Sequence, residues 1–212
     1  MFTLVSGAYR YFTRLDEYNV LILGPDGAGK TALLERIKSI YTGASGIPME
    51  KIQPTVGVNI GKVHLRRVLV KFMDLGGEKE LRGIWEAYFG DCHAVLFVLD
   101  SSLDRADGKG KGRGMDEVRD VLLKLVQAPE LAGLPLMVLA NKQDLGGDAD
   151  AESSLALVKE MVNGLADYMD GRHVRVIGSS AADGHGVRGA VDWLCTRMIE
   201  NRAIRPPMVS DI

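Results

Sequence analysis

The sequence is poor in cysteine, and its positive and negative charges nearly cancel. Two cysteines, Cys92 and Cys195, are too few for a disulfide framework in 212 residues, and each is interpreted as a small buried apolar residue. The 26 Lys and Arg residues face 28 Asp and Glu residues, so the formal net charge is −2. This balance provides no general attraction to nucleic acid or to anionic membranes, and we expect no nucleic-acid partner.

Long apolar segments are also missing. No run approaches the roughly 18 apolar residues that a membrane-spanning helix needs. The longest run, at 94–99, is predicted to be a strand. Ser6, Tyr9 and Arg10 interrupt the first residues, which are therefore not expected to act as a signal peptide. The protein is expected to be made and kept in the cytosol.

Short apolar runs alternate with segments of helical apolar spacing along the chain. Strands are predicted at 20–23, 56–65, 68–72, 94–99, 134–139 and 174–177. Helices are predicted from residue 29, from residue 81, and at 118–126, 155–169 and 187–199. This alternation predicts an α/β domain with a mostly parallel six-stranded sheet and helices on both faces. The Gly- and Lys-rich segment at 108–114 is interpreted as a solvated loop, with a basic contact to phosphate or lipid headgroups as the alternative.

Residues 24–31, Gly-Pro-Asp-Gly-Ala-Gly-Lys-Thr, match the P-loop pattern G-x-x-x-x-G-K-[ST] between a predicted strand and a predicted helix. The glycines let backbone N–H groups wrap a phosphate at a helix N-terminus, which already favours an anion. Lys30 is expected to reach the β- and γ-phosphates, and the Thr31 hydroxyl to bind Mg²⁺. The predicted nucleotide contacts here are Gly24, Asp26, Gly27, Ala28, Gly29, Lys30 and Thr31. The alternative is a glycine-rich turn without a ligand.

Two further motifs follow, Pro-Thr-Val-Gly at 54–57 and Asp-Leu-Gly-Gly-Glu at 74–78. Thr55 is predicted to be the second hydroxyl ligand of the metal, with a backbone contact to the γ-phosphate. Asp74 ends an apolar strand, where its carboxylate can hold Mg²⁺ through water. Gly77 leaves room for its backbone N–H to approach the γ-phosphate. Each motif alone would indicate only a turn, and their position after the P-loop is what favours these roles.

A fourth motif, Asn-Lys-Gln-Asp at 141–144, follows another apolar strand and is typical of guanine selection. Asp144 can accept hydrogen bonds from the ring N–H and the exocyclic amine of guanine. Adenine offers neither donor there and would leave the carboxylate unpaired. Lys142 can lie along the base through its aliphatic stem, while Asn141 can tie neighbouring loops together. The predicted base-side residues are Asn141, Lys142, Asp144, Ser180 and Ala181, the last through its backbone.

These motifs resemble those of the Arf and Arf-like small GTPases over nearly the whole chain. The matching features are Asp26 and the segments 54–60, 74–77 and 141–144, while 9–12, 16–18, 205–207 and 211–212 are most similar to the Arf-related branch. The resemblance implies a GTPase that binds GTP or GDP with Mg²⁺ and cycles between cytosol and the cytoplasmic face of the trans-Golgi. It implies a monomer that takes part in vesicle-mediated protein transport with an exchange factor, an activating protein and effectors.

The same resemblance divides the chain into three parts. These are an amphipathic membrane and switch helix at 1–17, a GTP-binding domain at 18–204 and a tail at 205–212. Residue 2 is Phe2 rather than glycine, so the N-myristoylation signal of ordinary Arfs is absent. The resemblance implies instead that an acetylated initiator methionine docks on an integral Golgi membrane protein. It also implies that the strands before Asp74 shift register on GTP loading and displace the helix. The alternative is a helix packed permanently on the domain.

Glu78 stands where a hydrolysing GTPase of this family carries glutamine. An ionised carboxylate can accept a proton from the attacking water but cannot donate one, and it adds negative charge near the γ-phosphate. Catalysis is assigned to Glu78, Gly77 and Lys30, with slow intrinsic hydrolysis that needs an activating partner to supply an arginine. Two alternatives stay open: Glu78 points outward while another group orients the water, or the protein is a GTP-binding scaffold with little or no hydrolysis. A P-loop kinase or ATPase is disfavoured because Asp144 selects guanine.

Overall fold

The computed structural model of the 212-residue chain describes residues 15–65, 67–102, 113–169 and 171–210. The predicted helix at 1–17 lies outside the described residues except for its last three positions, which belong to a strand. All but the last two residues of the Gly- and Lys-rich segment at 108–114 also lie outside them. None of the helices in the described ranges is long and apolar enough to cross a bilayer.

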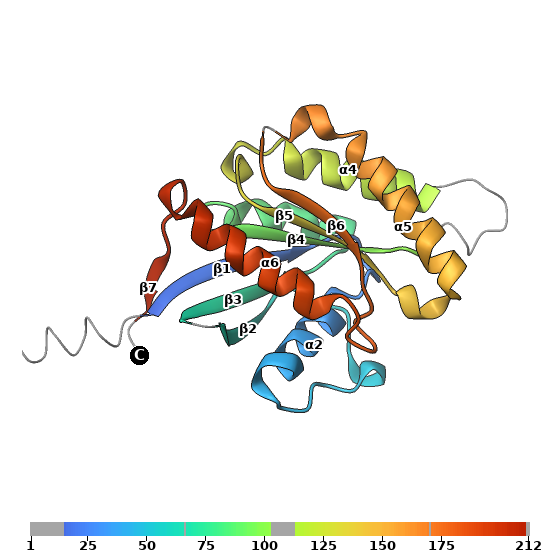
Figure 1. The fold of residues 1–212 in the computed structure, drawn as a ribbon, viewed down its shortest axis with the longest axis horizontal. Helices are drawn as coiled ribbons and strands as arrows, with labels where there is room; N and C mark the ends of the chain where they lie inside the picture. Colours follow the sequence, from blue (N-terminus) through green and yellow to red (C-terminus); the bar gives the residue numbers. More distant parts are fainter. Residues whose placement is uncertain (1–14, 66, 103–112, 170, 211–212) are drawn as a thin grey trace, which may run out of the picture.

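A seven-stranded sheet runs through the centre of the domain (Figure 1). The strand order is β2-β3-β1-β4-β5-β6, and β7 pairs with β1 beside this path. The strands are β1 (Leu15–Leu23), β2 (Val58–Leu65), β3 (Val68–Leu75), β4 (Ala94–Asp100), β5 (Leu136–Asn141), β6 (Val174–Gly178) and β7 (Met208–Ser210). All pairs are parallel except β2 with β3 and β7 with β1. The predicted mostly parallel sheet of six strands is therefore confirmed, and β7 is added to it.

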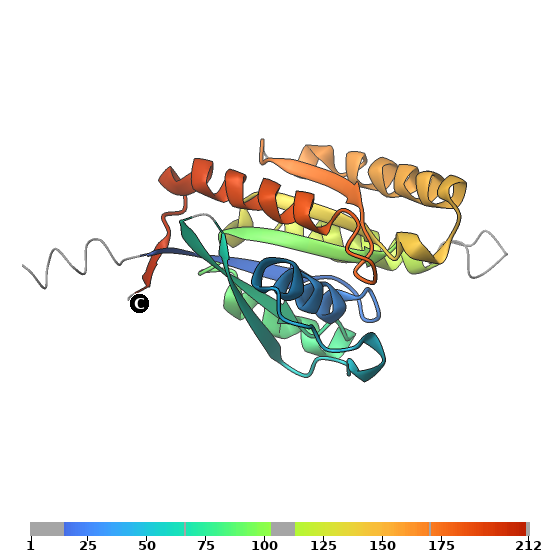
Figure 2. The same cartoon turned by 60° about the horizontal axis from the view of Figure 1, so that its bottom comes forward.

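Helices cover both faces of the sheet (Figure 2). Helices α2 (Lys30–Thr42) and α6 (Val187–Glu200) pack on one face, and α4 (Arg113–Val126) and α5 (Asp148–Asn163) pack on the other. Short 3-10 segments connect them: η1 (Met49–Lys51), η2 (Lys79–Tyr88), η3 (Pro129–Leu131), η4 (Gln143–Leu145), η5 (Ala166–Tyr168) and η6 (Asn201–Ala203). Two predictions are corrected here. The helix expected from residue 81 is the 3-10 segment η2, and the helix expected at 155–169 ends at Asn163, where Gly164 caps it.

Side chains of β1 point alternately into two hydrophobic cores. Val20 and Ile22 join the core beneath α2 and α6, whereas Leu21 and Leu23 join the core beneath α4 and α5. All four side chains have 0% exposure. A strand buried on both faces needs apolar residues at every position, which is why it is a continuous apolar run. Both cores thereby fix the carboxyl end of β1, from which the P-loop starts.

The described part of the predicted C-terminal tail is docked on the domain. Strand β7 pairs antiparallel with the first residues of β1. Just before it, the Pro206 carbonyl lies 3.0 Å from Nε2 of the buried His93. The Nδ1 atom of His93 accepts a hydrogen bond from the backbone N–H of Asn19 at 3.0 Å. Because a neutral imidazole has one acceptor and one donor nitrogen, Nε2 must donate to Pro206.

Candidate nucleotide site

The loop at 24–29 joins the end of β1 to the start of α2 and forms a backbone cradle. Gly29 caps α2 with a φ of 89°, a left-handed conformation that favours glycine. A Cβ on Gly29 would lie 2.5 Å from Nδ2 of Asn141, so a larger residue would displace that amide. The first N–H groups of α2 have no partner within the helix and, with the helix dipole, favour an anion. The predicted phosphate cradle therefore has the required backbone form.

Lys30 is buried at the first turn of α2, with 6% exposure. Its Nζ donates a hydrogen bond to the Pro25 carbonyl at 2.8 Å, so the side chain folds back over the cradle. Burial lowers the pKa of Lys30, while Asp74 and Asp26 act in the opposite direction. A buried ammonium gains stability from any anion that it can contact. The geometry and charge of Lys30 therefore suit a phosphate in the cradle.

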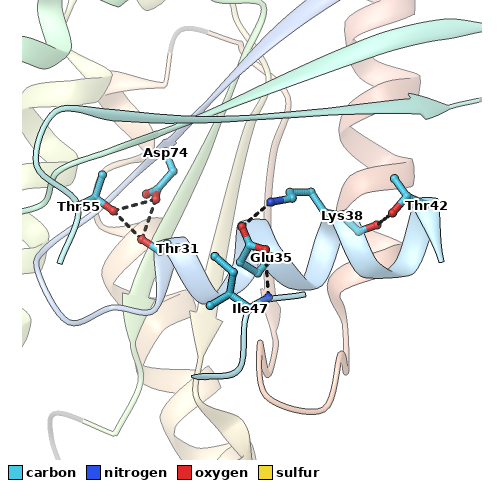
Figure 3. Close-up of polar contacts among 7 residues, drawn as sticks. All are labelled: Thr31, Glu35, Lys38, Thr42, Ile47, Thr55 and Asp74. Carbon is cyan, nitrogen blue, oxygen red and sulfur yellow. Dashed lines mark hydrogen bonds and ion pairs between the residues drawn. The ribbon is translucent and has the colours of Figure 1, made fainter. Parts of the chain in front are cut away.

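Three predicted metal-site residues meet in one cluster (Figure 3). The Thr31 hydroxyl on α2 donates to Oδ2 of Asp74 at 2.7 Å, and the Thr55 hydroxyl donates to the same oxygen at 3.1 Å. The two hydroxyl oxygens lie 2.7 Å apart. Asp74 has 0% exposure at the end of β3. Side chains from three distant segments of the sequence therefore converge at this point.

The cluster fits a magnesium ion. Oδ1 of Asp74 is buried and has no hydrogen-bond partner in the described part of the chain. Burial raises the pKa of Asp74, although hydrogen bonds from the two threonine hydroxyls and the charge of Lys30 oppose it. Hydroxyl and carboxylate oxygens are hard ligands, and Mg²⁺ is usually held by few protein groups together with water and phosphate. Thr31 and Thr55 would bind the ion and Asp74 would support it, so that it could neutralise phosphate charge.

Gly77 lies against the cradle, just beyond the end of β3. A Cβ at this position would lie 2.7 Å from the Asp26 nitrogen and 2.7 Å from the Pro25 carbonyl carbon. It would also clash with Nζ of Lys30. Such a close approach of two backbone segments requires glycine. The structure therefore places Gly77 beside the predicted phosphate contacts.

Two side chains of η2 tie this region to the rest of the domain. Nε of Arg82 donates to the Gly77 carbonyl at 2.9 Å, and its guanidinium forms an ion pair with Glu117 of α4 at 2.8 Å. Nε1 of the buried Trp85 donates to the Gly76 carbonyl at 2.9 Å. The sequence analysis does not predict these contacts because they depend on how η2 packs. The Trp85 bond places its indole ring beside Gly76, the first of the two glycines after β3.

Glu78 lies at the start of η2, and its side chain is exposed. The carboxylate makes no hydrogen bond that caps η2. It follows directly after Gly77, which lies against the cradle, but its own side chain is exposed. A catalytic role for Glu78 therefore requires a bound partner or nucleotide to orient its side chain.

Asn141 connects the two loops on the base side of the site. Its Nδ2 donates to the Ala28 carbonyl at 2.8 Å, and its Oδ1 accepts from the Ala181 N–H at 3.0 Å. Ala181 and the preceding Ser180 are buried, at 4% and 1% exposure. The predicted tie between neighbouring loops is thus present. It holds the loop after β6 at a fixed position relative to the cradle.

Lys142 adopts a left-handed backbone with a φ of 65°, and its Nζ lies 2.7 Å from Oδ2 of Asp100. The sequence analysis does not include Asp100 in the site. A signal was available, because Asp100 ends β4 in register with Asn141 of β5. Burial acts to raise the pKa of Asp100, but hydrogen bonds from Lys142 and Ser102 outweigh it and lower the pKa. Asp144, in η4, is exposed and open to a ligand.

A cleft of about 290 Å³ brings the phosphate and metal residues together. It lies between the cradle, the segment 49–55 and Gly77. Its lining includes Asp26, Gly27, Gly29, Lys30, Thr31, Thr55 and Gly77. The base-side residues are joined to this cleft through the hydrogen bond from Asn141 to Ala28. The cleft therefore combines an anion cradle with an oxygen cluster for a metal, and Asn141 connects the cradle to the base-side loops.

The chain is similar to known proteins over most of its length. The sequence model of the ADP-ribosylation factor family matches residues 6–198. ADP-ribosylation factor-like protein 3 of Saccharomyces cerevisiae is 38% identical over 209 residues, which cover 98% of this chain and 99% of that protein. ADP-ribosylation factor-related protein 1 of Bos taurus is 37% identical over 215 residues, which cover 100% of both chains.

A solved structure is also similar in fold. The Arl6 BBS3 small GTPase from Trypanosoma brucei, with the bound nucleotide analogue GppNp, matches with a TM-score of 0.67 and 26% identity. The match covers 87% of this chain and 98% of that one. The likeness therefore extends over nearly the whole described domain.

Proposed function

The chain belongs to the ADP-ribosylation factor family of small GTPases, and we propose that it is a switch in vesicle-mediated protein transport at the trans-Golgi. With GTP bound it attaches to the cytoplasmic face of the membrane and recruits effectors, and with GDP bound it returns to the cytosol. Similarity over the full chain to Arf-related protein 1 and to yeast Arf-like protein 3 supports placing it in this branch.

The observation that carries the switch mechanism is the cluster of Thr31, Thr55 and Asp74. Thr31 belongs to the helix that starts at the cradle, whereas Thr55 belongs to a loop that is free of regular structure. Its hydroxyl contacts both of the other side chains, at 2.7 and 3.1 Å. Mg²⁺ and a γ-phosphate at this position would hold the loop, and loss of the γ-phosphate would release it. The state of the nucleotide would thereby control the surface that effectors contact.

The off-switch is slow in this proposal. Members of the family hydrolyse GTP. In this chain Glu78 occupies the motif position that faces the attacking water, and its side chain is exposed and does not cap η2. A carboxylate adds negative charge where the transition state already concentrates it. Efficient hydrolysis would therefore depend on an activating protein that supplies a cation and orders the segment after Gly77.

The membrane partner in this proposal is an integral Golgi membrane protein that binds the N-terminal segment. An exchange factor loads GTP, and the protein acts as a monomer. The family resemblance and the Met1-Phe2 terminus support this docking mode over myristoylation.

Membrane partitioning tests the proposal. The full chain and a variant without residues 1–14, which leaves β1 intact, are each loaded with GDP or GppNp and mixed with Golgi-enriched membranes or with liposomes made from extracted lipids. Only the full chain with GppNp is expected to sediment, and the Golgi membranes should retain more of it than the liposomes. Equal partitioning of both proteins in both nucleotide states would exclude a membrane switch. Equal retention by Golgi membranes and liposomes would exclude the protein partner.

A further inference from the structure

Arg36 on α2 holds the loop that follows β6. Its Nε donates to the Ala181 carbonyl at 2.9 Å, and its Nη2 contacts the Ala182 carbonyl. The aliphatic stem packs on the same loop, because a Cβ on Gly184 would lie 3.4 Å from Cδ of Arg36. Two nitrogens of one planar group therefore hold two successive carbonyls. A lysine ammonium does not reproduce this fork geometry.

These contacts close a ring of interactions around the base side of the site. Asn141 connects the cradle at Ala28 to the N–H of Ala181, at 2.8 and 3.0 Å. Arg36 connects the carbonyl of the same Ala181 back to α2, the helix that begins at the cradle. The Ala181 N–H thus donates to Asn141 of β5, and the Ala181 carbonyl accepts from Arg36 of α2. If Arg36 were removed, the Ala181 carbonyl would lose its hydrogen bond, while the Asn141 contact and the backbone bonds that join Ser180 to Gly184 and His185 would remain.

The neighbouring Glu35 contacts a different loop. Its Oε2 accepts from the N–H of Ile47 at 3.3 Å, and Oε1 pairs with Lys38 at 2.6 Å. Ile47 belongs to the segment that leads toward the metal-binding Thr55. Two successive residues of α2 therefore hold two different loops: Glu35 holds the segment at Ile47, and Arg36 holds the loop after β6.

We propose that Arg36 is a positioning residue for guanine selectivity, acting through the loop at 180–182. This inference rests on the proposed function, since it names a further residue of the same nucleotide site. Asp144 selects the ring N–H and amine of guanine, and the remaining edge of that base presents only the acceptors O6 and N7. The N–H groups of Ser180 and Ala181 already donate to His185 and Asn141, so the Ala182 N–H is the donor of this loop that suits those acceptors. Arg36 acts on that loop from α2, through the carbonyls of Ala181 and Ala182.

The test compares Arg36→Met, Arg36→Lys and Arg197→Met with the wild type. Methionine keeps the apolar stem and removes the guanidinium. Arg197 is a control that removes the same charge from α6, where it pairs with Glu200. Affinities for GDP and ADP are measured by competition against a fluorescent GDP derivative in the presence of Mg²⁺. Unfolding temperature is recorded for every protein.

Arg36→Met is expected to bind GDP about tenfold more weakly, as for a lost charge-assisted hydrogen bond that is partly transmitted to the ligand. Its ADP affinity should not change, so the preference for GDP over ADP falls by the same factor. Arg36→Lys should lie between Arg36→Met and the wild type, and Arg197→Met should match the wild type. An Arg36→Met protein that binds GDP as tightly as wild type would overturn the inference. So would an equal loss of GDP and ADP affinity, which would indicate a general structural effect.

The wild type itself separates this inference from the proposed function. If wild-type protein showed no preference for GDP over ADP, the proposed function would fail before any variant was considered. If the wild type prefers GDP and Arg36→Met keeps that preference in full, only the role of Arg36 fails.

Discussion

The Lys142 ammonium lies 2.7 Å from the Asp100 carboxylate, across the two neighbouring strands β4 and β5. Lys142 also has the left-handed φ of 65°, a backbone conformation that is rare outside glycine. The ion pair anchors the end of the Lys142 side chain. Asp100 therefore supports the predicted base-side residue Lys142.

Replacing Asp100 with Asn tests this role. The lost ion pair should weaken GDP binding by about threefold to tenfold, since a partly exposed pair contributes on the order of 1 kcal/mol. The folded-state pKa of Asp100 is lowered, so its stabilising effect is present above the ordinary carboxyl pKa and disappears as pH falls through the folded value. The stability difference between wild type and Asp100→Asn should therefore shrink below about pH 4. Urea unfolding at several pH values measures it, and a difference that grows with acid would contradict the assignment.

Thr31→Ala tests the metal cluster. Chelation of Mg²⁺ should speed GDP release from the wild type, because the ion joins the cradle to the phosphates. The variant lacks one of the two hydroxyl ligands, so it should release GDP at least about tenfold faster with Mg²⁺ present and respond little to chelation. Thr42→Ala is the control, since its hydroxyl lies at the other end of α2, where it donates to the Lys38 carbonyl and accepts from the Ala44 N–H. A Thr31→Ala protein with the full response to chelation would remove Thr31 from the metal site.

Glu78→Gln tests the slow off-switch. Glutamine is neutral and can both donate to and accept from water, so single-turnover GTP hydrolysis should accelerate about tenfold or more. Glu80→Gln provides a matched control, because Glu80 is another exposed carboxylate two residues further along η2. Its rate should equal that of the wild type. An unchanged or slower rate in Glu78→Gln would show that the carboxylate does not limit hydrolysis.

His93 predicts a pH-dependent stability. Burial lowers its pKa, although the carbonyl of Pro206 and the charge of Asp91 act in the opposite direction. Since the unfolded chain binds the proton more readily, stability is full above the ordinary histidine pKa and falls as pH drops below about 6.5. Replacing His93 with Asn should lower the free energy of unfolding by about 1–3 kcal/mol and remove part of this pH dependence.

Unfolding of the wild type and His93→Asn between pH 5.5 and 8 checks this prediction. Parallel curves for the two proteins over this range would mean that His93 does not titrate on unfolding.

The phosphate, metal and base motifs can be predicted from the sequence, because their residue types and spacing determine which ligand groups they can bind. Thr31 lies in the first turn of α2, Thr55 lies in the loop before β2, and Asp74 lies near the end of β3. All three follow from motifs at one edge of the sheet, and the structure joins their side chains within 2.7 to 3.1 Å. The buried strands can also be predicted from the sequence, because a strand that is covered on both faces is apolar at every position.

Other contacts could not be predicted in this way. Arg36 and Arg82 reach their carbonyl partners across loops whose relative placement only the packed domain defines. The helical spacing of apolar residues does not distinguish an α-helix from a 3-10 segment of 10 residues, so the sequence predicts an α-helix where η2 forms. Strand β7 has three residues and no apolar pattern of its own, and it depends on pairing with β1 and on the Pro206 contact to His93.

Trp85 provides the most direct test of the switch. Its indole N–H donates to the Gly76 carbonyl, next to Gly77 and the cradle, and Trp193 on α6 is the other tryptophan of the chain. In a Trp193→Phe protein, fluorescence therefore reports on Trp85 alone. Exchange of GDP for GTP in the presence of Mg²⁺ should change the emission, and the signal should return to the GDP level only as GTP is hydrolysed. Identical emission with GDP, GTP and GppNp bound would contradict a nucleotide-controlled switch.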